Sequence, residues 1–320
     1  MEIKGILVTM LAPMSDHIAN GGEKILGNAS SIKQRPDGRV YISGQKQRHA
    51  LFSAMERLNF EESKRNGTYV SNGDGVTTII EKDLRADLGG FLQTKKEHYS
   101  GRRTAPLSAT PAVAYNELRA NVNGDEAKAT SEVGRDLLIR LKVNENKDTR
   151  DQALATREYS QEDLMLMNFF IDVGAVSIRK RFKYEDEMHL DTEYVKHVDE
   201  PERRRRIRLA LEATNSLTDY ANQARNAVSG EPQKVLIVFD TKLSRKASRY
   251  FRAGETEQAN ILKELDKRGA KYFLGDDTSG EAISVMDAYE AAYKFFDDNT
   301  LFDPTGGAAT ITSEQFENER

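Results

Sequence analysis

The sequence predicts an α+β fold of the ferredoxin-like plan, and two observations carry that prediction. Apolar runs of strand length and amphipathic helical stretches follow one another in the order strand, helix, strand, strand, helix, strand. A long polar stretch rich in turn-forming residues, at 60–133, interrupts this order after the first helix. We therefore expect one sheet-and-helix domain with an irregular insertion rather than two independent cores.

Composition excludes several classes of protein. The 320 residues carry a net charge of −4, no Cys and five scattered His. The absence of Cys excludes disulfides, thiolate metal sites and a cysteine nucleophile, and the His spacing fits no metal motif. No apolar run reaches the ~20 residues of a membrane span, and no secretion signal opens the sequence. We therefore expect a soluble, cytoplasmic protein with no membrane contact, metal or cofactor.

The first strand is expected at 3–10, where apolar residues alternate loosely. Turn-forming residues crowd 15–39 and predict a long loop closed by a tight hairpin at 36–38. A return strand at 40–42 is followed by a helix whose apolar stripe begins at Ala50. That stripe is typical of a helix that packs on a sheet.

The junction of this strand and helix is a candidate anion site. The first backbone N–H groups of a helix have no partner inside the helix and lie at the positive end of its dipole. Between residues 33 and 49, five basic residues stand against one acid, although the whole chain is acidic. The alternative is a surface pair, Arg48 and His49, beside acids such as Glu56. The candidate ligands of the first turn are Gln45, Lys46, Arg48 and His49.

The insertion at 60–133 contains two recognisable features. Residues 83–91 predict a short helix that ends at glycine. The stretch 101–108 predicts an exposed basic loop, in which Arg102 and Arg103 either contact an anion or belong to a solvated turn.

Two further strands are expected at 137–143 and 164–178, and a last core strand at 235–239. Directly after the second of these, four cations surround one aromatic residue at Arg179, Lys180, Arg181, Phe182 and Lys183. The pattern is typical either of an element that stacks nucleic-acid bases or of a hairpin tip with a half-buried Phe.

Four arginines at 203–206 open the next helix, where cations oppose the helix dipole. The acids at 199–202 are one explanation for this placement, and an external anion such as phosphate is the other. Farther along, 271–274 predicts a strand, and 283–296 predicts a helix with Ile283 and Met286 on its buried stripe.

Four stretches, in this order along the chain, together resemble a known family. They are 41–52, 83–91, 102–112 and 134–141. The series resembles the repeated backbone subunit of type I CRISPR effector complexes, known as Cascade, and is most similar to the DevR-like branch of type I-B and related systems. The resemblance covers roughly residues 1–245.

This resemblance implies a hand-shaped protein with an RRM-like palm, irregular fingers and a thumb hairpin. Copies of such a subunit oligomerise head to tail along a CRISPR RNA, present it for pairing with target DNA and bind other effector-complex subunits. The implied parts are the palm at 1–59 plus 134–178 plus 203–245, the fingers at 60–133, the thumb at 179–202, an extension of the palm at 246–302 and a flexible tail at 303–320.

The resemblance also implies RNA-binding residues. Phosphate contacts fall on Gln45, Lys46, Arg48 and His49, and a finger contact falls on Arg102 and Arg103. Arg179 and Arg181 would lie at the base of the thumb. The residue that wedges between bases stays open among Phe182, Met188 and Leu190. Phosphate contacts carry no sequence information, which suits a subunit that must hold any guide.

Two other functions compete with this non-catalytic scaffold. Type III relatives of the fold cleave target RNA with an aspartate in the loop before the Tyr-Ile-x-Gly step, and that position falls near Gln34 here. Asp37 is close, but Pro36-Asp37-Gly38 is better explained as a turn. We therefore expect no enzyme, with an endoribonuclease that uses Asp37 as the alternative. The third interpretation is an α+β binding protein without RNA.

Overall fold

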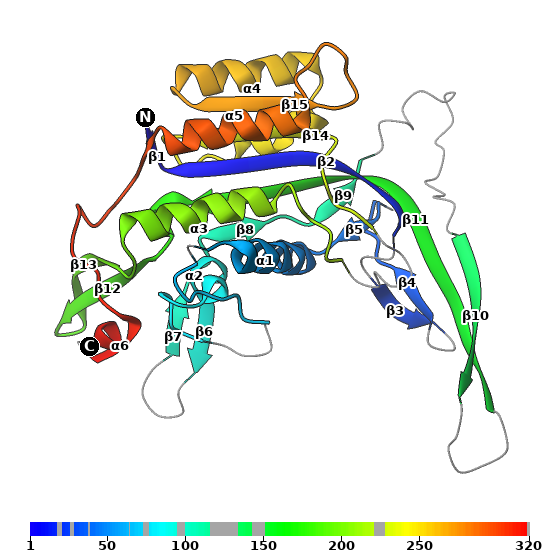
Figure 1. Ribbon diagram of the computed structural model, residues 1–320, viewed down its shortest axis with the longest axis horizontal. Helices are drawn as coiled ribbons and strands as arrows, with labels where there is room; N and C mark the ends of the chain where they lie inside the picture. Colours follow the sequence, from blue (N-terminus) through cyan, green and yellow to red (C-terminus); the bar gives the residue numbers. More distant parts are fainter. Residues whose placement is uncertain are drawn as a thin grey trace.

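The computed structural model describes residues 1–17, 21–25, 29–37, 39–63, 65–72, 77–94, 100–115, 134–142, 151–220 and 228–318. These residues build a mixed fold of helices and antiparallel sheets around one large sheet (Figure 1). The α+β class predicted from the sequence is confirmed. Residues 116–133, which belong to the expected insertion, lie outside the described residues.

The large sheet has the strand order β15-β14-β2-β11-β9-β5, and neighbouring strands are antiparallel. Strand β2, the first long strand of the chain, lies between two strands that come from the middle and the end of the sequence. The strands are β15 (Lys271–Asp276), β14 (Lys234–Asp240), β2 (Gly5–His17), β11 (Asp151–Asp172), β9 (Ala112–Ala114) and β5 (Tyr41–Ile42).

Both faces of this sheet are covered. The side chains of β2 alternate, so that Ile6, Val8 and Met10 join one core while Leu7 and Leu11 join another. The first core is completed by α1 (Gly44–Glu61), α3 (Glu200–Ala213) and α5 (Val285–Asp297). The second is closed by the 3₁₀ helix η3 (Lys246–Arg252) and by α4 (Glu255–Lys267). The sheet is therefore buried on both sides.

Short elements surround this centre. Strand β1 (Glu2–Ile3) pairs with β16 (Thr300–Leu301), and β3 (Gly21–Ile25) pairs with β4 (Ala29–Ile32). The 3₁₀ helix η2 (Val173–Ala175) follows β11. The elements that matter for the site are α2 (Leu84–Gly89), the hairpin of β6 (Phe91–Thr94) and β7 (Ser100–Arg103), and the hairpin of β12 (Ile178–Glu185) and β13 (Met188–Lys196).

The strand expected at 137–143 does form, but not in the centre of the sheet. Strand β10 (Gly134–Lys142) pairs with the first part of β11, and this two-stranded arm projects away from the helices (Figure 1). The place beside β11 in the sheet is taken by β9 and by β8 (Leu107–Ala109). Each of these strands has three residues, too few to show an alternating pattern in the sequence.

The C-terminal part differs from the sequence-based expectation in two ways. Ile283 and Met286 are exposed, although α5 forms and buries the other side of its stripe. The expected flexible tail is packed instead: α6 (Ser313–Asn318) buries Phe316, and Thr310 forms a β-bridge with Lys196. Composition predicted disorder because this segment is rich in Gly and Thr, but it gains its order from distant residues. Within the described ranges, no helix is long and apolar enough to cross a membrane.

Candidate nucleic-acid interface

Helix α1 begins at a strand end that fixes its first turn. The side chain of Ser43 caps the helix by accepting a hydrogen bond from the Lys46 N–H at 3.2 Å. Gly44 lets the backbone approach the turn between β8 and β9, since a Cβ there would lie 2.8 Å from the carbonyl oxygen of Ala109. The cap takes one of the backbone donors offered to an anion, so side chains become the main candidate ligands.

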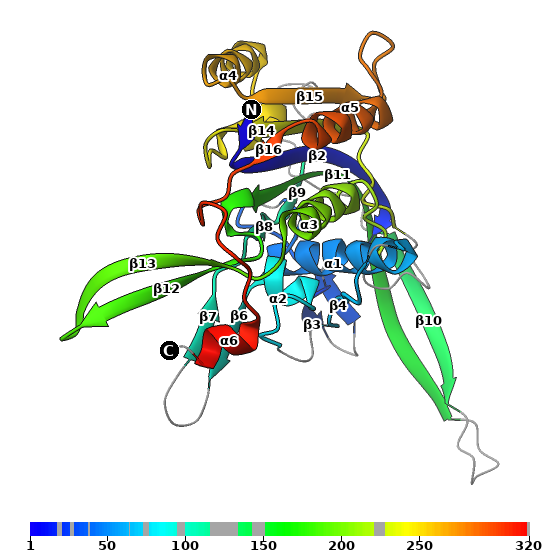
Figure 2. The same cartoon turned by 60° about the vertical axis from the view of Figure 1, so that its left-hand side comes forward.

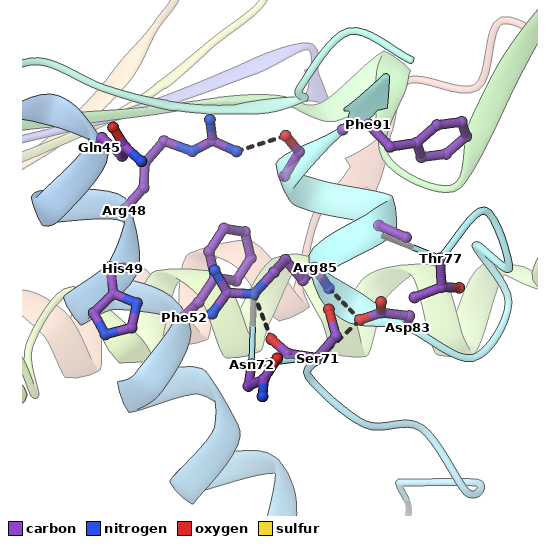
Figure 3. A pocket seen from close by; sticks show the side chains of 13 residues that line it. Gln45, Arg48, His49, Phe52, Ser71, Asn72, Thr77, Asp83, Arg85 and Phe91 are labelled. Atoms are coloured by element: carbon purple, nitrogen blue, oxygen red, sulfur yellow. Dashed lines mark hydrogen bonds between the residues drawn. The ribbon is translucent and has the colours of Figure 1, made fainter. Parts of the chain in front are cut away.

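A polar cavity of about 470 Å³, here called the α1 cavity, lies between α1 and the residues around α2 (Figure 3). Gln45, Arg48, His49 and Phe52 line it from α1, because positions three and four apart share one side of a helix. The opposite wall comes from 71–72 and 83–91. Three of the four residues predicted in the first turn therefore meet in one cavity.

Two guanidinium groups enter the α1 cavity from opposite walls. Arg48 donates a hydrogen bond to the carbonyl oxygen of Gly89, whereas Arg85 donates to that of Ser71 and lies over the Phe52 ring at 4.7 Å. Burial lowers the pKa of both arginines, and the charge of Arg85 lowers the pKa of Arg48 further. A bound anion would offset this repulsion.

Asp83 is the carboxylate among the lining residues. Its Oδ1 atom accepts hydrogen bonds from the backbone N–H groups of Ser71 and Arg85 at 3.1 and 2.9 Å. One acid against two arginines leaves the α1 cavity with a net positive charge. The acid also caps α2, which holds Arg85 at a fixed position in the wall.

Lys46 lies elsewhere on α1. It is not among the residues that line the α1 cavity, since one residue step turns a helix by about 100° away from Gln45. Burial lowers the pKa of Lys46, whereas the nearby carboxylate of Asp219 raises it. Lys46 therefore lies near Asp219, and the prediction that it shares one site with Arg48 does not hold for the α1 cavity.

A second cavity of about 750 Å³, here called the hairpin groove, lies at the base of the β12–β13 hairpin. Its lining includes the exposed cations Arg102 and Lys180 and the exposed rings of Phe182 and Tyr184. Burial raises the pKa of Asp172, which also lines the groove. Cations beside aromatic rings are the combination with which proteins hold single-stranded nucleic acid.

Arg103 has a structural role, so the prediction of an exposed basic loop is wrong for this residue. It is buried, and its Nη2 atom lies 2.7 Å from Oδ1 of Asp87, a carboxylate with no exposed surface. Arg103 also donates to the carbonyl oxygens of Ala175 and Ile178. Its neighbour Arg102 is exposed, as predicted.

Asp87 joins several elements. Arg206 of α3 reaches its Oδ2 atom at 2.8 Å. Ser177 donates its backbone N–H to Oδ1 at 2.7 Å and its hydroxyl to Oδ2 at 2.6 Å. Burial opposes the charge of this carboxyl, but Arg103 and Arg206 outweigh burial and hold the pKa of Asp87 below its ordinary value. This buried cluster fixes α2, β7 and α3 at the start of the β12–β13 hairpin.

Arg179 also binds groups inside the protein. Its guanidinium is buried, forms an ion pair with Glu317 at 3.0 Å and lies over the Phe316 ring at 3.9 Å. Arg181 lies over the same ring at 5.0 Å and pairs with Glu193 at 3.4 Å. As described, neither arginine is open to an RNA strand, which differs from the role that the resemblance implied.

The three wedge candidates are all exposed on the β12–β13 hairpin, at 50% for Phe182, 67% for Met188 and 58% for Leu190. Phe182 lines the hairpin groove together with Tyr184, and both rings contact His189 edge-on at 5.9 and 5.7 Å. Met188 and Leu190 are absent from the described lining of that groove. The geometry favours Phe182 among the three.

The four arginines at 203–206, in the first half of α3, bind carboxylates and carbonyl oxygens of the same chain. Arg205 and Arg206 pair with Glu202 at 2.7 and 2.8 Å, while Arg203 and Arg204 donate to backbone carbonyl oxygens. Asp199 caps the helix through the N–H of Glu202 at 2.9 Å. The interpretation through neighbouring acids is therefore confirmed in part, with backbone carbonyls as the partners that the sequence did not indicate.

Asp37 lies in the predicted turn. It accepts hydrogen bonds from the backbone and side chain of Arg39, which lower the pKa of its carboxyl. Gln34 and Val40 form an antiparallel bridge that closes this turn. In the ranges that the structure describes, no three His, Asp or Glu side chains are grouped to hold a metal ion.

Arg85 is a residue of the α1 cavity that sequence reasoning missed. Arg85 is the single arginine of the stretch 83–91 and stands between Asp83 and Asp87, so nothing in the sequence separates it from a surface charge. Its place opposite α1 depends on Gly90, which has φ of +68° and would bring a Cβ within 2.5 Å of the Arg103 carbonyl oxygen. The glycine predicted to end this helix was the available signal.

A comparison with known families agrees with these features. A family model described as "CRISPR-associated negative auto-regulator DevR/Csa2" matches residues 39–239, which is more than half of the chain. The chain belongs to the DevR/Csa2 family of CRISPR-associated proteins. The family resemblance found in the sequence is thereby confirmed.

Solved structures share the fold of this DevR/Csa2 family member. One chain comes from a "CRISPR RNA-guided surveillance complex" and another from a "CRISPR RNA-guided surveillance complex, pre-nicking". Both have a TM-score of 0.52, with sequence identities of 12% and 14%, and each alignment covers 91% of this chain and 99% of the other. No curated protein matches the sequence.

Proposed function

We propose that this protein is a non-catalytic backbone subunit of a type I CRISPR effector complex. In this role, copies oligomerise head to tail along the CRISPR RNA and present it for pairing with target DNA. The other effector-complex subunits are further partners, and the complex works in the cytoplasm. Family membership and the shared fold of surveillance-complex chains support this proposal.

The arrangement of the sheet supports the finer description as an RRM-like palm. Strands β14, β2 and β11, followed by the short β8 and β9, are neighbours, and α1 and α3 share one core on the same face. This is the strand order and helix placement of a split βαβ domain. On this assignment 60–133 forms the fingers and 179–202 the thumb.

The observation that carries the proposal is the α1 cavity with its two facing arginines. Arg48 and Arg85 converge from separate elements, half-buried and with one opposing acid. The hairpin groove adds exposed cations and aromatic rings. The β6–β7 hairpin lies between the two cavities, because its Phe91 lines the α1 cavity and its Arg103 lines the hairpin groove. Phosphate at the α1 cavity and bases at the hairpin groove fit a single strand that passes both.

The deciding experiment measures how much CRISPR RNA co-purifies with the protein from a host that expresses a CRISPR repeat array together with the partner subunits. Arg48→Glu combined with Arg85→Glu is expected to abolish co-purification of RNA, since two attractive charges become repulsive. The matched control is Arg249→Glu on η3, where an exposed arginine pairs with Glu257 at 3.5 Å. Unchanged RNA loading in the Arg48 and Arg85 variant would remove the α1 cavity from the interface.

The endoribonuclease alternative is tested with the same complex. Guide-complementary RNA and magnesium are added, and cleavage products are resolved on a gel. The hydrogen bonds of Asp37 to Arg39 favour a turn-forming role, so we expect no evenly spaced products. Products that disappear in Asp37→Ala would overturn the non-catalytic assignment.

A further inference from the structure

The C-terminal segment crosses the base of the β12–β13 hairpin. Figure 2 shows it in red, running from β16 past the hairpin to α6, which lies beside β6 and β7. Three anchors hold the segment: Lys196 pairs with Asp303 at 2.9 Å, the Ile311 N–H donates to the Lys196 carbonyl at 3.0 Å, and Ser313 donates to Glu81 at 2.6 Å.

The last turn of this segment fills a site built around Arg179. The Phe316 ring, with no exposed surface, packs against the guanidinium groups of Arg179 and Arg181 and contacts the His197 ring edge-on at 5.6 Å. One residue later, the carboxylate of Glu317 pairs with Arg179 at 3.0 Å. A flat ring and an anion therefore meet one arginine side by side.

A ring next to an anion is also what one nucleotide presents to a protein. Arginine guanidinium groups stack on bases and bind phosphates, and here the same group stacks on Phe316 and pairs with Glu317. Arg179 also lines the hairpin groove, where Arg102, Lys180 and Phe182 are exposed. The groove therefore adjoins the site that α6 covers.

We propose that α6 is an internal nucleotide mimic that masks an RNA-binding site at the hairpin base. A nucleotide of a single-stranded RNA replaces Phe316 and Glu317 at Arg179 and Arg181, and α6 is displaced when the strand enters the hairpin groove. The free subunit thus holds this site closed. This inference rests on the proposed function, because it concerns how the same RNA is admitted.

The test measures the affinity of the full chain for a fluorescently labelled single-stranded RNA of mixed sequence. Phe316→Ala combined with Glu317→Gln is expected to bind about tenfold more tightly, the equivalent of one stacked base. The charge-matched control, Glu314→Gln, changes an exposed residue of α6 and is expected to leave the affinity unchanged. Adding Arg179→Gln to the double variant is expected to remove the gain.

An affinity that stays equal or falls in the double variant would overturn the mimicry, as would a gain that survives Arg179→Gln. If Arg48→Gln weakens binding while the α6 variants have no effect, the proposed function stands and this inference fails. If the unaltered chain and all variants fail to bind RNA, both fail.

Hydrogen exchange on the unaltered chain gives an independent readout. RNA is expected to speed amide exchange in α6, because a displaced helix loses its protecting contacts. Exchange in α6 that stays constant or slows when RNA binds would overturn displacement, even if the variants fold poorly.

Discussion

At the scale of single residues, a buried carboxylate holds two arginines in structural roles. Asp87 binds Arg103 and Arg206 at 2.7 and 2.8 Å, so two of the many cations near the cavities serve the fold. Within the part of the chain that the structure describes, Arg48, Arg85 and Arg102 form no ion pair with a carboxylate, and they line the cavities. The placement of acids therefore separates structural arginines from those that we propose to bind RNA.

Asp87→Asn is expected to destabilise the protein by about 3–5 kcal/mol, because it leaves two buried guanidinium groups with a neutral partner. Chemical denaturation measures the free energy of unfolding. Asp37→Asn is the control, since Asp37 pairs with Arg39 in an exposed turn and its loss should leave the denaturation midpoint unchanged. Equal midpoints for the two variants would contradict the role assigned to the Asp87 cluster.

His197 predicts a pH dependence of stability. Burial, followed by the charges of Arg103 and Arg179, lowers the pKa of His197 from 6.5 to about 4. Below pH 6.5 the unfolded chain takes up a proton that the folded chain refuses until about pH 4, so stability falls as the pH drops through this window. The loss attributable to His197 reaches about 3 kcal/mol.

The measurement compares urea denaturation at several pH values for the unaltered chain and for His197→Gln, which cannot titrate. The variant is expected to lose stability less steeply between pH 6.5 and pH 4. Parallel curves between pH 6.5 and pH 4 would show that groups other than His197 cause the acid sensitivity in this window. Asp303 acts at lower pH: hydrogen bonds and the charge of Lys196 outweigh its burial and lower its pKa to about 2, so its contribution is lost only below about pH 4.

At the scale of elements, the two ends of the β12–β13 hairpin have different expected roles: the tip is proposed to contact RNA, and the base contributes to stability. The outer half of the hairpin exposes rings, whereas its base is held by the Asp87 cluster through Ser177 and by the C-terminal segment through the bridge of Thr310 with Lys196. Changes at the tip should therefore alter RNA contacts without altering the fold. Changes at the base should do both.

Phe182→Ala is expected to weaken RNA binding by about tenfold while leaving thermal stability unchanged, because half of the ring is already exposed. Met188→Ala is the matched control, since Met188 lies on the same hairpin outside the described lining of the groove. Fluorescence of 2-aminopurine placed along the RNA measures unstacking. If Met188→Ala reduces unstacking and Phe182→Ala does not, the wedge is assigned to the wrong residue.

Elements with a strong local signal could be predicted from the sequence. Helix α1, the glycine-ended α2, and β14 and β15 all form where their patterns place them. The short strand β9 could not be found, because three residues show no periodicity. The observed strand pairing around β10 therefore differs from the predicted one, although β10 itself forms as predicted.

The candidate site could be predicted only in part, for a different reason. Gln45, Arg48 and His49 share a helix face, and helical spacing alone brings them together. Whether an arginine is free depends on partners far away in sequence: Arg179 meets Glu317, which is 138 residues away. Spacing carries no information about such pairs, so the sequence alone cannot show that Arg103 and Arg179 are held inside the protein.

At the scale of the whole molecule, the basic lining of the two cavities on a chain with a net charge of −4 supports the proposal that RNA organises the assembly. We expect the purified chain to be a monomer without RNA and to form complexes with RNA whose mass rises in steps of one chain as the RNA is lengthened. Mass photometry over a series of RNA lengths measures the steps. A constant mass, or identical assembly without RNA, would contradict a filament built on the guide.

The position of β2 also sets the order in which the protein can be made. Strand β2 emerges first during synthesis, yet its neighbours in the sheet are β11 and β14, the second of which ends at Asp240. Pairing over such sequence separations is slow, because a long loop must close before the contacts form. The sheet therefore closes only after most of the chain has left the ribosome, and the surface that we propose for RNA is complete only after this step.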